Sequence, residues 1–225
     1  VEVFNSCKLE VLEVSEILNK IYPLFETYRE IIRYRNQLQF FFPSVHTEVN
    51  HCDYCILEAI KTLNPKAYNL IKDKGQKLFL DSSKNLQRVY SDFIDEIVEL
   101  FTQSKRNAVR DIMTDWIDLS KSKGQKSQTK RLCSKIYFDR YFLQATPKDF
   151  IKDADVDSFN ANGVESICDW IKSKEVIYPD TEIARSLLAR VDRDPLKDII
   201  QTNICIAIST SRLAERDSFA AIADE

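Results

Sequence analysis

The stretch DSSKNLQRVYSDFIDEIVELF, residues 81–101, has the clearest helical periodicity in the chain and decides the fold class. Its apolar residues recur at three- and four-residue spacing, which places them on one face of an α-helix. They are Leu86, Val89, Tyr90, Phe93, Ile97, Leu100 and Phe101. Asp81, Ser82 and Ser83 offer side chains that can cap the first turn. The pattern predicts a long amphipathic helix with one side packed against a core.

Composition extends this prediction to the whole chain of 225 residues. Three glycines and six prolines are too few for the turns of an all-β or doubly wound fold, and 44% hydrophobic content is enough for a core. The sequence therefore predicts an all-α protein, an irregular multi-helix bundle. Further helices are expected over residues 8–20, 26–42, 50–64, 65–74, 104–119 and 133–143, with three or more helices after them. The aromatic residues 40–42 end the helix over 26–42, and Asn50 can cap the helix that follows.

One basic stretch divides the chain. Residues 120–131, SKSKGQKSQTKR, contain no apolar side chain and carry five positive charges without a negative one. These charges are Lys121, Lys123, Lys126, Lys130 and Arg131. We expect a solvated linker between a lid-like helical domain, residues 1–119, and a second helical lobe, residues 132–225. Such a polycation could attract nucleic acid or an acidic membrane surface, but it lacks the aromatic residues that stack on bases.

The net charge, the hydropathy and the cysteines limit the possible functions and cellular locations of the protein. The net charge of −3 and the pI near 5.6 argue against a general nucleic-acid binder. No run of about 18 apolar residues could span a bilayer, and the first ten residues do not read as a secretory signal. Six scattered cysteines predict reduced thiols and a cytoplasmic location. Because the chain begins without Met and ends on a helical pattern, we expect it to be part of a longer protein.

A possible metal site lies in HTEVNHCDYCIL, residues 46–57. Cys52 and Cys55 would be one turn apart on a helix, and His46 or His51 could add a third ligand. The second half of such a site is missing, because these are the only two histidines and the other cysteines are isolated. We expect buried helix cysteines and no metal.

Other catalytic patterns are incomplete. The acidic stretch 153–165 begins like a calcium loop, but Ser158 stands at the glycine position and Glu165 comes one place late, so a solvated acidic turn that caps a helix is favoured. The chain has no phosphate-binding loop and no Gly-x-Ser-x-Gly elbow. We expect no enzymatic activity in these residues. A hydrolase that uses His51 with Cys52 or Cys55 is the remaining catalytic alternative.

The stretch TYREIIRYRNQLQFFFPSVHTEVNHCDYCILEAIKTLNPKAYNLI, residues 27–71, resembles the region after the nucleotide-binding core in KAP-family P-loop NTPases. That family has a Pro-Arg-x-[IV]-[KR]-[RK]-[FY]-x-Asn-x-Leu helix, then a Val-Asn-x-x-Asp-x-x-x-Leu-Glu-Ala-Ile helix and a Pro-x-x-Tyr turn. The matching residues are Arg29, Arg33, Tyr34, Asn36, Leu38, Val49, Asn50, Asp53, Leu57, Glu58, Ala59 and Ile60. Tyr28 replaces the family's proline. In this register both helix cysteines occupy variable positions.

The stretch KRLCSKIYFDRYFLQATPKDFIKDADVDSF, residues 130–159, is similar to a later Tyr-Phe-x-Arg-Tyr-Phe segment of bacterial members of that family. Its aromatic residues at helical spacing are equally typical of a core. They are Tyr137, Phe138, Tyr141 and Phe142. The two segments occur in the family's order and together cover about a third of the chain.

The resemblance implies a helical lid that supplies a γ-phosphate-sensing arginine to an upstream core, which would bind ATP and Mg²⁺. Arg29 and Arg33 are the candidates, with Asn36 beside them. A guanidinium keeps its charge and can hold a phosphate bidentately. The alternative is a solvated face or ion pairs with Glu26 or Glu30.

The leading hypothesis is therefore the helical C-terminal module of a KAP-type NTPase. It would relay the nucleotide state and recognise a protein partner, which for the intact protein implies bacterial antiphage defence or membrane-associated signalling. The alternative is a free-standing helical protein-interaction module without an NTPase.

Overall fold

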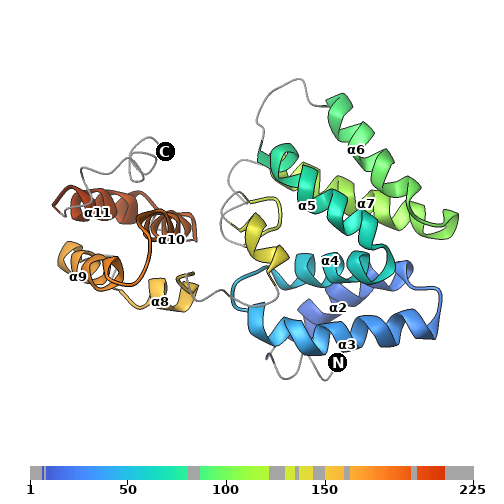
Figure 1. Ribbon diagram of the computed structural model, residues 1–225, viewed down its shortest axis with the longest axis horizontal. Coiled ribbons are helices and arrows are strands. Elements are labelled where there is room, and N and C mark those ends of the chain that lie inside the picture. Colours follow the sequence, from blue (N-terminus) through green and yellow to red (C-terminus); the bar gives the residue numbers. More distant parts are fainter. Residues whose placement is uncertain are drawn as a thin grey trace. The chain divides into compact units, whose positions relative to one another are not determined.

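The computed structural model describes residues 7, 9–80, 87–121, 130–134, 137–143, 150–159, 163–193 and 197–210. Within these ranges the chain forms helices and no β-strand, which confirms the all-α fold class (Figure 1). The α-helices are α2 (Val11–Ile21), α3 (Tyr28–Val45), α4 (His51–Leu63), α5 (Pro65–Leu80), α6 (Gln87–Glu99), α7 (Gln103–Lys121), α8 (Asp153–Asp157), α9 (Val164–Glu175), α10 (Asp180–Arg193) and α11 (Lys197–Thr210). Two 3₁₀ helices, η1 (Tyr22–Leu24) and η2 (Phe138–Phe142), complete the described elements. None of the described helices is long and apolar enough to cross a membrane.

The chain divides into two compact units, residues 1–145 and 146–225. The predicted boundary, a linker at 120–131 followed by a lobe from residue 132, is therefore wrong. Residues 130–134 and 137–143, here called the 130–143 segment, belong to the first unit because their polar and aromatic side chains are buried there. Lys121 ends α7, and residues 122–129 lie outside the described ranges.

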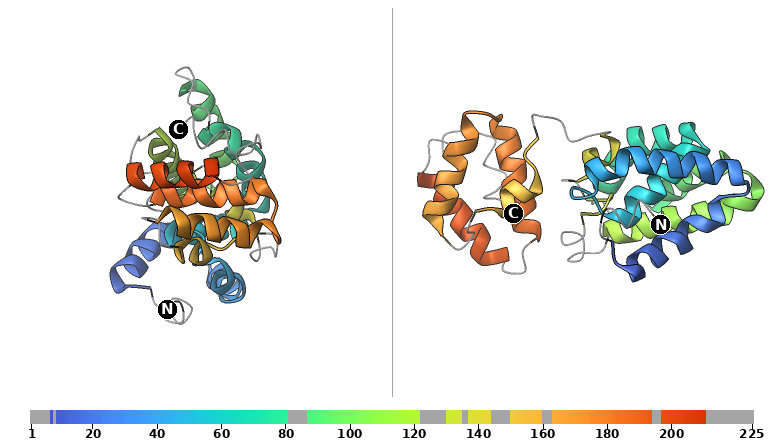
Figure 2. Two further views of the ribbon diagram at one scale, coloured as in Figure 1. Left: turned by 90° about the vertical axis from the view of Figure 1, so that its left-hand side faces the viewer. Right: turned by 90° about the horizontal axis from the view of Figure 1, so that it is seen from below.

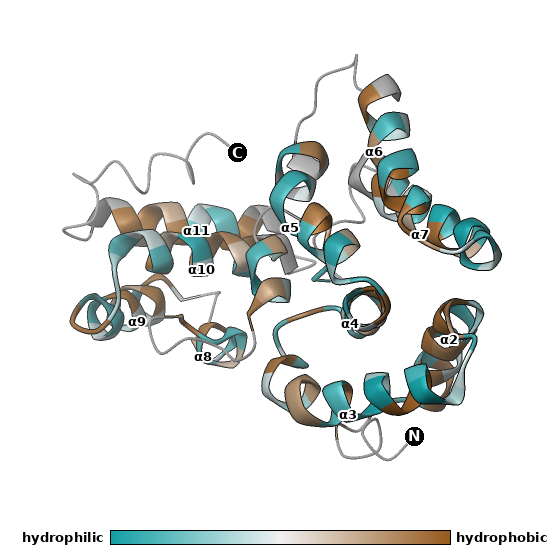
Figure 3. Ribbon diagram, turned by 45° about the vertical axis from the view of Figure 1, so that its right-hand side comes forward, coloured by the Kyte–Doolittle hydropathy of each residue, from teal (hydrophilic) through white to brown (hydrophobic). Residues whose placement is uncertain are grey.

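The centre of the first unit is α4, which packs against α2, α3 and α5; Figure 3 shows it end-on between them. Ten of its thirteen residues are buried, so it is enclosed around nearly its whole circumference. The Asn50 side chain accepts a hydrogen bond from the backbone N–H of Asp53 at 3.1 Å, which confirms the predicted N-cap. Cys52 and Cys55 are 6% and 0% exposed, as expected for helix cysteines in a core.

A buried carboxylate lies on the same helix. Glu58 is 2% exposed, and its Oε1 accepts from Nζ of Lys61 at 2.8 Å. The ammonium of Lys61 also lies 5.1 Å from the ring centre of Phe41 and 5.3 Å from that of Tyr68, in cation–π geometry. Burial raises the pKa of Glu58, and the bond with Lys61 opposes this rise only in part.

This carboxyl should make stability depend on pH. A carboxyl whose folded pKa is raised stabilises the fold below its unfolded pKa, about 4.3, and loses that contribution as pH rises through the folded pKa. The unfolding free energy of wild type, relative to Glu58→Gln, should therefore increase as pH falls from neutral. Urea titrations at several pH values measure the difference, and a constant difference would contradict the expectation.

Two helices continue beyond their predicted ends. α3 was expected to stop before Pro43, but it runs through that proline to Val45. The buried residues Leu38, Phe42 and Val45 share one face, so packing on the core offsets the hydrogen bond that proline cannot donate. α5 likewise runs past Gly75, which is buried on the same face as Ile71.

The predicted aromatic helix over 133–143 is also different. Only η2 is helical among its described residues, while Tyr137, Phe138 and Tyr141 are at most 2% exposed. The prediction of core aromatics is confirmed for these three residues, whereas Phe142 is only partly buried. The aromatic residues have helix-like spacing because they are buried, but the segment that buries them is irregular. A helix over 133–143 was therefore inferred where only a short 3₁₀ helix forms.

The second unit has its own hydrophobic core. α9 and α10 pack against α11, and α8 packs against α10; Figure 2 shows α9, α10 and α11 side by side in orange to red. The side chains of Ile167, Ile171 and Leu187 are fully buried at the centre. Residues 153–157 of the predicted acidic turn form α8, where Asp153 is buried, and Asp155 and Asp157 pair with Lys174 and Arg190. The expectation of a solvated turn is thus wrong for Asp153.

Candidate functional site

A capping box fixes the start of α3. The Oγ1 of Thr27 accepts from the backbone N–H of Glu30 at 3.2 Å, and Oε2 of Glu30 accepts from the backbone N–H of Thr27 at 3.1 Å. The same carboxylate oxygen accepts from the backbone N–H of Glu26 at 2.8 Å. Three donors at the helix start are thereby satisfied, so the first turn has one defined conformation.

The start of α7 holds both acidic residues of this turn. Nζ of Lys105 lies 2.7 Å from Glu30 and 3.5 Å from Glu26, and the Lys105 side chain is only 7% exposed. Burial tends to raise the pKa of Glu30, but the hydrogen bond from Lys105 and the two backbone donors hold it below its ordinary value. Glu26 also accepts from the hydroxyls of Ser104 and Thr102.

The pairing with Lys105 bears on the two predicted sensor arginines, Arg29 and Arg33. The alternative expectation was a solvated face or ion pairs with Glu26 or Glu30. The structure gives both carboxylates to Lys105, so the ion pairs are absent, and the exposure of both arginines agrees with a solvated face. Arg29 and Arg33 are exposed, and no carboxylate in the described part of the chain lies within ion-pair distance of either. Two permanent positive charges beside the start of α3 therefore have no partner among the carboxylates that the structure describes.

Asn36 and Phe40 continue the same face. Residues 29, 33, 36 and 40 are spaced by four, three and four, which aligns them along the side of α3 opposite the buried Tyr34, Leu38 and Phe42. Asn36 is exposed and Phe40 is 78% exposed. We call these four residues the outward face of α3. The sequence analysis missed Phe40 because it grouped residues 40–42 as one apolar run. The four-residue spacing from Asn36 could have placed Phe40 on this face.

Lys130 and Arg131 do not belong to a solvated linker. Arg131 forms an ion pair with the fully buried Asp53, with Nε 2.8 Å from Oδ2. The backbone N–H of Leu132 also donates to Oδ2, at 2.9 Å, and the indole N–H of Trp116 donates to Oδ1, at 2.9 Å. Burial nevertheless raises the pKa of Asp53, because it outweighs these stabilising partners. The basic-patch prediction is wrong for Arg131, whose charge is used within the fold.

Two further contacts hold the 130–143 segment to the start of α4. Arg140 and Glu48, 3% and 4% exposed, form a buried ion pair at 2.5 Å. The Tyr141 hydroxyl donates to the carbonyl of Lys130 at 2.7 Å and accepts from the backbone N–H of Asn50 at 3.0 Å. Lys130 has a positive φ of 50°, a strained conformation for a residue other than glycine, and these bonds hold it in place. A nucleic-acid contact stays a prediction for Lys121, Lys123 and Lys126, whose side chains the structure does not describe.

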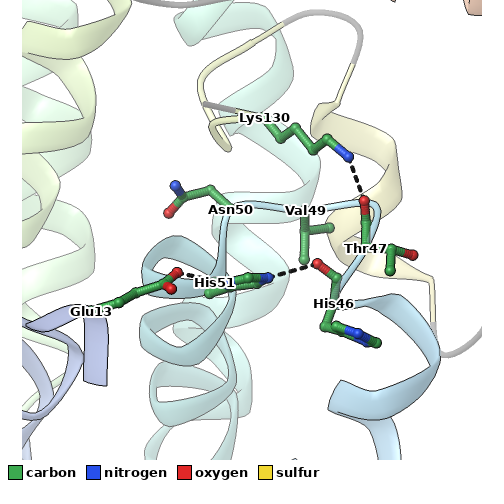
Figure 4. A pocket seen from close by; sticks show the side chains of 7 residues that line it. All are labelled: Glu13, His46, Thr47, Val49, Asn50, His51 and Lys130. Atoms are coloured by element: carbon green, nitrogen blue, oxygen red, sulfur yellow. Dashed lines mark hydrogen bonds and ion pairs between the residues drawn. The ribbon is translucent and has the colours of Figure 1, made fainter. Parts of the chain in front are cut away.

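A pocket of about 540 Å³ lies where α2, α4 and the 130–143 segment meet (Figure 4). His51 is in its wall, with Nδ1 2.5 Å from the Glu13 carboxylate and Nε2 2.9 Å from the backbone carbonyl of His46. The Lys130 ammonium donates to the carbonyl of Thr47. Both ring nitrogens of His51 are engaged by groups of the fold, so the geometry does not support this histidine as a general base.

The burial of Cys52 and Cys55 also argues against the hydrolase alternative. Burial raises the pKa of the Cys52 thiol to about 12 and raises that of Cys55 as well. The thiolate is the form that attacks substrates and binds metals, so burial disfavours both roles. The described residues contain no group of three His, Cys, Asp or Glu side chains placed to hold a metal ion. None of the six cysteines forms a disulfide bond, and the cytoplasmic location stays a prediction.

Comparison of the chain with protein-family models, curated proteins and solved structures finds no match.

Proposed function

We propose that this chain is a helical recognition module that presents Arg29 and Arg33 to an anionic partner. The supporting observation is that Glu26 and Glu30 pair with Lys105, so that both arginines are exposed and no carboxylate in the described part of the chain pairs with either. An exposed arginine pair without a carboxylate partner among the described residues suits the bidentate binding of phosphate or carboxylate groups.

The resemblance of residues 27–71 and 130–159 to the KAP family suggests which anion this is. In that proposal the partner is the γ-phosphate of ATP held with Mg²⁺ by a P-loop NTPase core, and the chain relays the nucleotide state to a protein partner. Antiphage defence or membrane-associated signalling follows as the proposed setting. α3, α4 and the start of α5 occur in the order that the family pattern requires.

The first test is the reading frame upstream of Val1, which should encode Gly-x₄-Gly-Lys-Ser/Thr followed by an acidic pair at the end of a strand. The second is ATP turnover by the protein that contains this core and the present chain. Arg29→Ala combined with Arg33→Ala should lower turnover by about ten-fold or more. The variant lacks both guanidinium groups, which would otherwise stabilise the charge that develops on the phosphate during transfer.

Arg35→Ala is the matched control, since Arg35 is exposed on the same helix but away from the outward face. Turnover should be retained in this variant. Equal effects of the control and of the double variant, or unchanged turnover in the double variant, would leave the alternative of a protein-interaction module without an NTPase. The exposed Val176 and Ile177, 87% and 69% accessible, provide an apolar surface for such contacts.

A further inference from the structure

The outward face of α3 has two chemically different ends. Arg29 and Arg33 lie toward the start of the helix, Phe40 lies toward its end, and Asn36 lies between them. At 1.5 Å per residue, the face is about 16 Å long from Arg29 to Phe40. It therefore offers cationic, amide and aromatic groups in a row on one continuous surface.

Phe40 is positioned in spite of its exposure. Its ring meets that of Phe41 edge-to-face, with centroids 4.9 Å apart, and the Phe41 ring lies under the ammonium of Lys61. Lys61 is in turn held by the buried Glu58. The Phe40 ring is therefore supported on one side by the Phe41 ring, and the residue is otherwise open to solvent, at 78% exposure.

We propose that the outward face of α3 binds a nucleoside triphosphate lengthwise, with the phosphates on Arg29 and Arg33 and the base stacked on Phe40. Charge complementarity selects a polyanion at one end, because both guanidinium groups have no carboxylate partner among the described residues. An exposed aromatic ring can stack on any of the nucleobases, because each of them has a flat π-face. The amide of Asn36 can both donate and accept, which suits the sugar hydroxyls or the base edge between these two ends.

This inference rests on the proposed function and adds the base as a recognised group. It assigns binding to the chain itself, so the experiment uses the 225-residue chain. Isotope-labelled protein is titrated with Mg·ATP and, separately, with Mg-tripolyphosphate, and the amide shifts of α3 are followed by NMR. The wild type should bind ATP about ten-fold more tightly than tripolyphosphate, because only ATP has a base to stack.

Phe40→Ala should remove this preference by weakening ATP binding about ten-fold, while tripolyphosphate binding stays unchanged. Tyr28→Ala is the matched control: Tyr28 is also 78% exposed on α3 but points away from the outward face, so both affinities should be retained. Arg29→Ala with Arg33→Ala should weaken both ligands.

The outcomes separate the two proposals. If Phe40→Ala keeps the preference for ATP while the arginine variant loses both ligands, base stacking is overturned and the arginine function stands. If tripolyphosphate and ATP bind the wild type equally, the face is a simple polyanion site and the inference is also overturned. Absence of binding to the chain overturns it as well, whereas the turnover experiment decides the proposed function independently.

Discussion

Asp53→Asn is expected to lower the unfolding free energy by about 3–5 kcal/mol. Both carboxylate oxygens act as acceptors, Oδ1 for the Trp116 indole N–H and Oδ2 for the backbone N–H of Leu132, and the Arg131 guanidinium forms an ion pair with Oδ2. An asparagine must turn its NH₂ group toward one of these donors. It also leaves the charge of Arg131 without its partner. Urea unfolding followed by circular dichroism measures the loss.

Asp115→Asn is the matched control for this substitution. Its carboxylate is 57% exposed and lies 3.4 Å from Nζ of Lys20, so the same chemical change should alter stability by less than about 1 kcal/mol. A loss at Asp53 that is no larger than the loss at Asp115 would mean that the 130–143 segment is not held by this carboxylate.

Arg140→Leu is expected to cost about 3 kcal/mol or more, because it leaves the buried Glu48 carboxylate without this guanidinium. The Tyr137 ring, 4.9 Å from the guanidinium, also loses a cation–π contact. Urea titrations of the variant, at constant pH, give the change in unfolding free energy.

The double variant Glu48→Leu with Arg140→Leu separates charge from packing. Removing both buried charges should recover most of the stability that the single variant loses, since two apolar groups need no desolvation. A double variant as unstable as the sum of the two single variants would contradict an ionic role and indicate that the shape of Arg140 is what matters.

The sequence was sufficient for features whose causes are local. The amide of Asn50 directly before an apolar run predicted both the cap and the start of α4, and these are confirmed. The end of α3 was missed because the preference of proline is also local, whereas the burial of Phe42 and Val45 beyond it depends on neighbouring helices. A propensity argument cannot weigh that burial.

The 130–143 segment could not have been placed from the sequence for a similar reason. Arg131 reads as one of five charges in a polar run, and its partner Asp53 is 78 positions away in the sequence. Nothing in the spacing of either residue indicates the other. The candidate arginines were found through the family resemblance, but whether they were paired depended on Lys105, 75 residues from Glu30.

One side of α3 is buried in the core and the other is exposed, and this difference has an evolutionary consequence. Tyr34, Leu38 and Phe42 hold the helix in the core, while Arg29, Arg33 and Phe40 contribute little to it. Substitutions at the latter three positions should therefore change the chemistry of this surface with little loss of stability, so the specificity of the proposed recognition face can diverge without unfolding the protein.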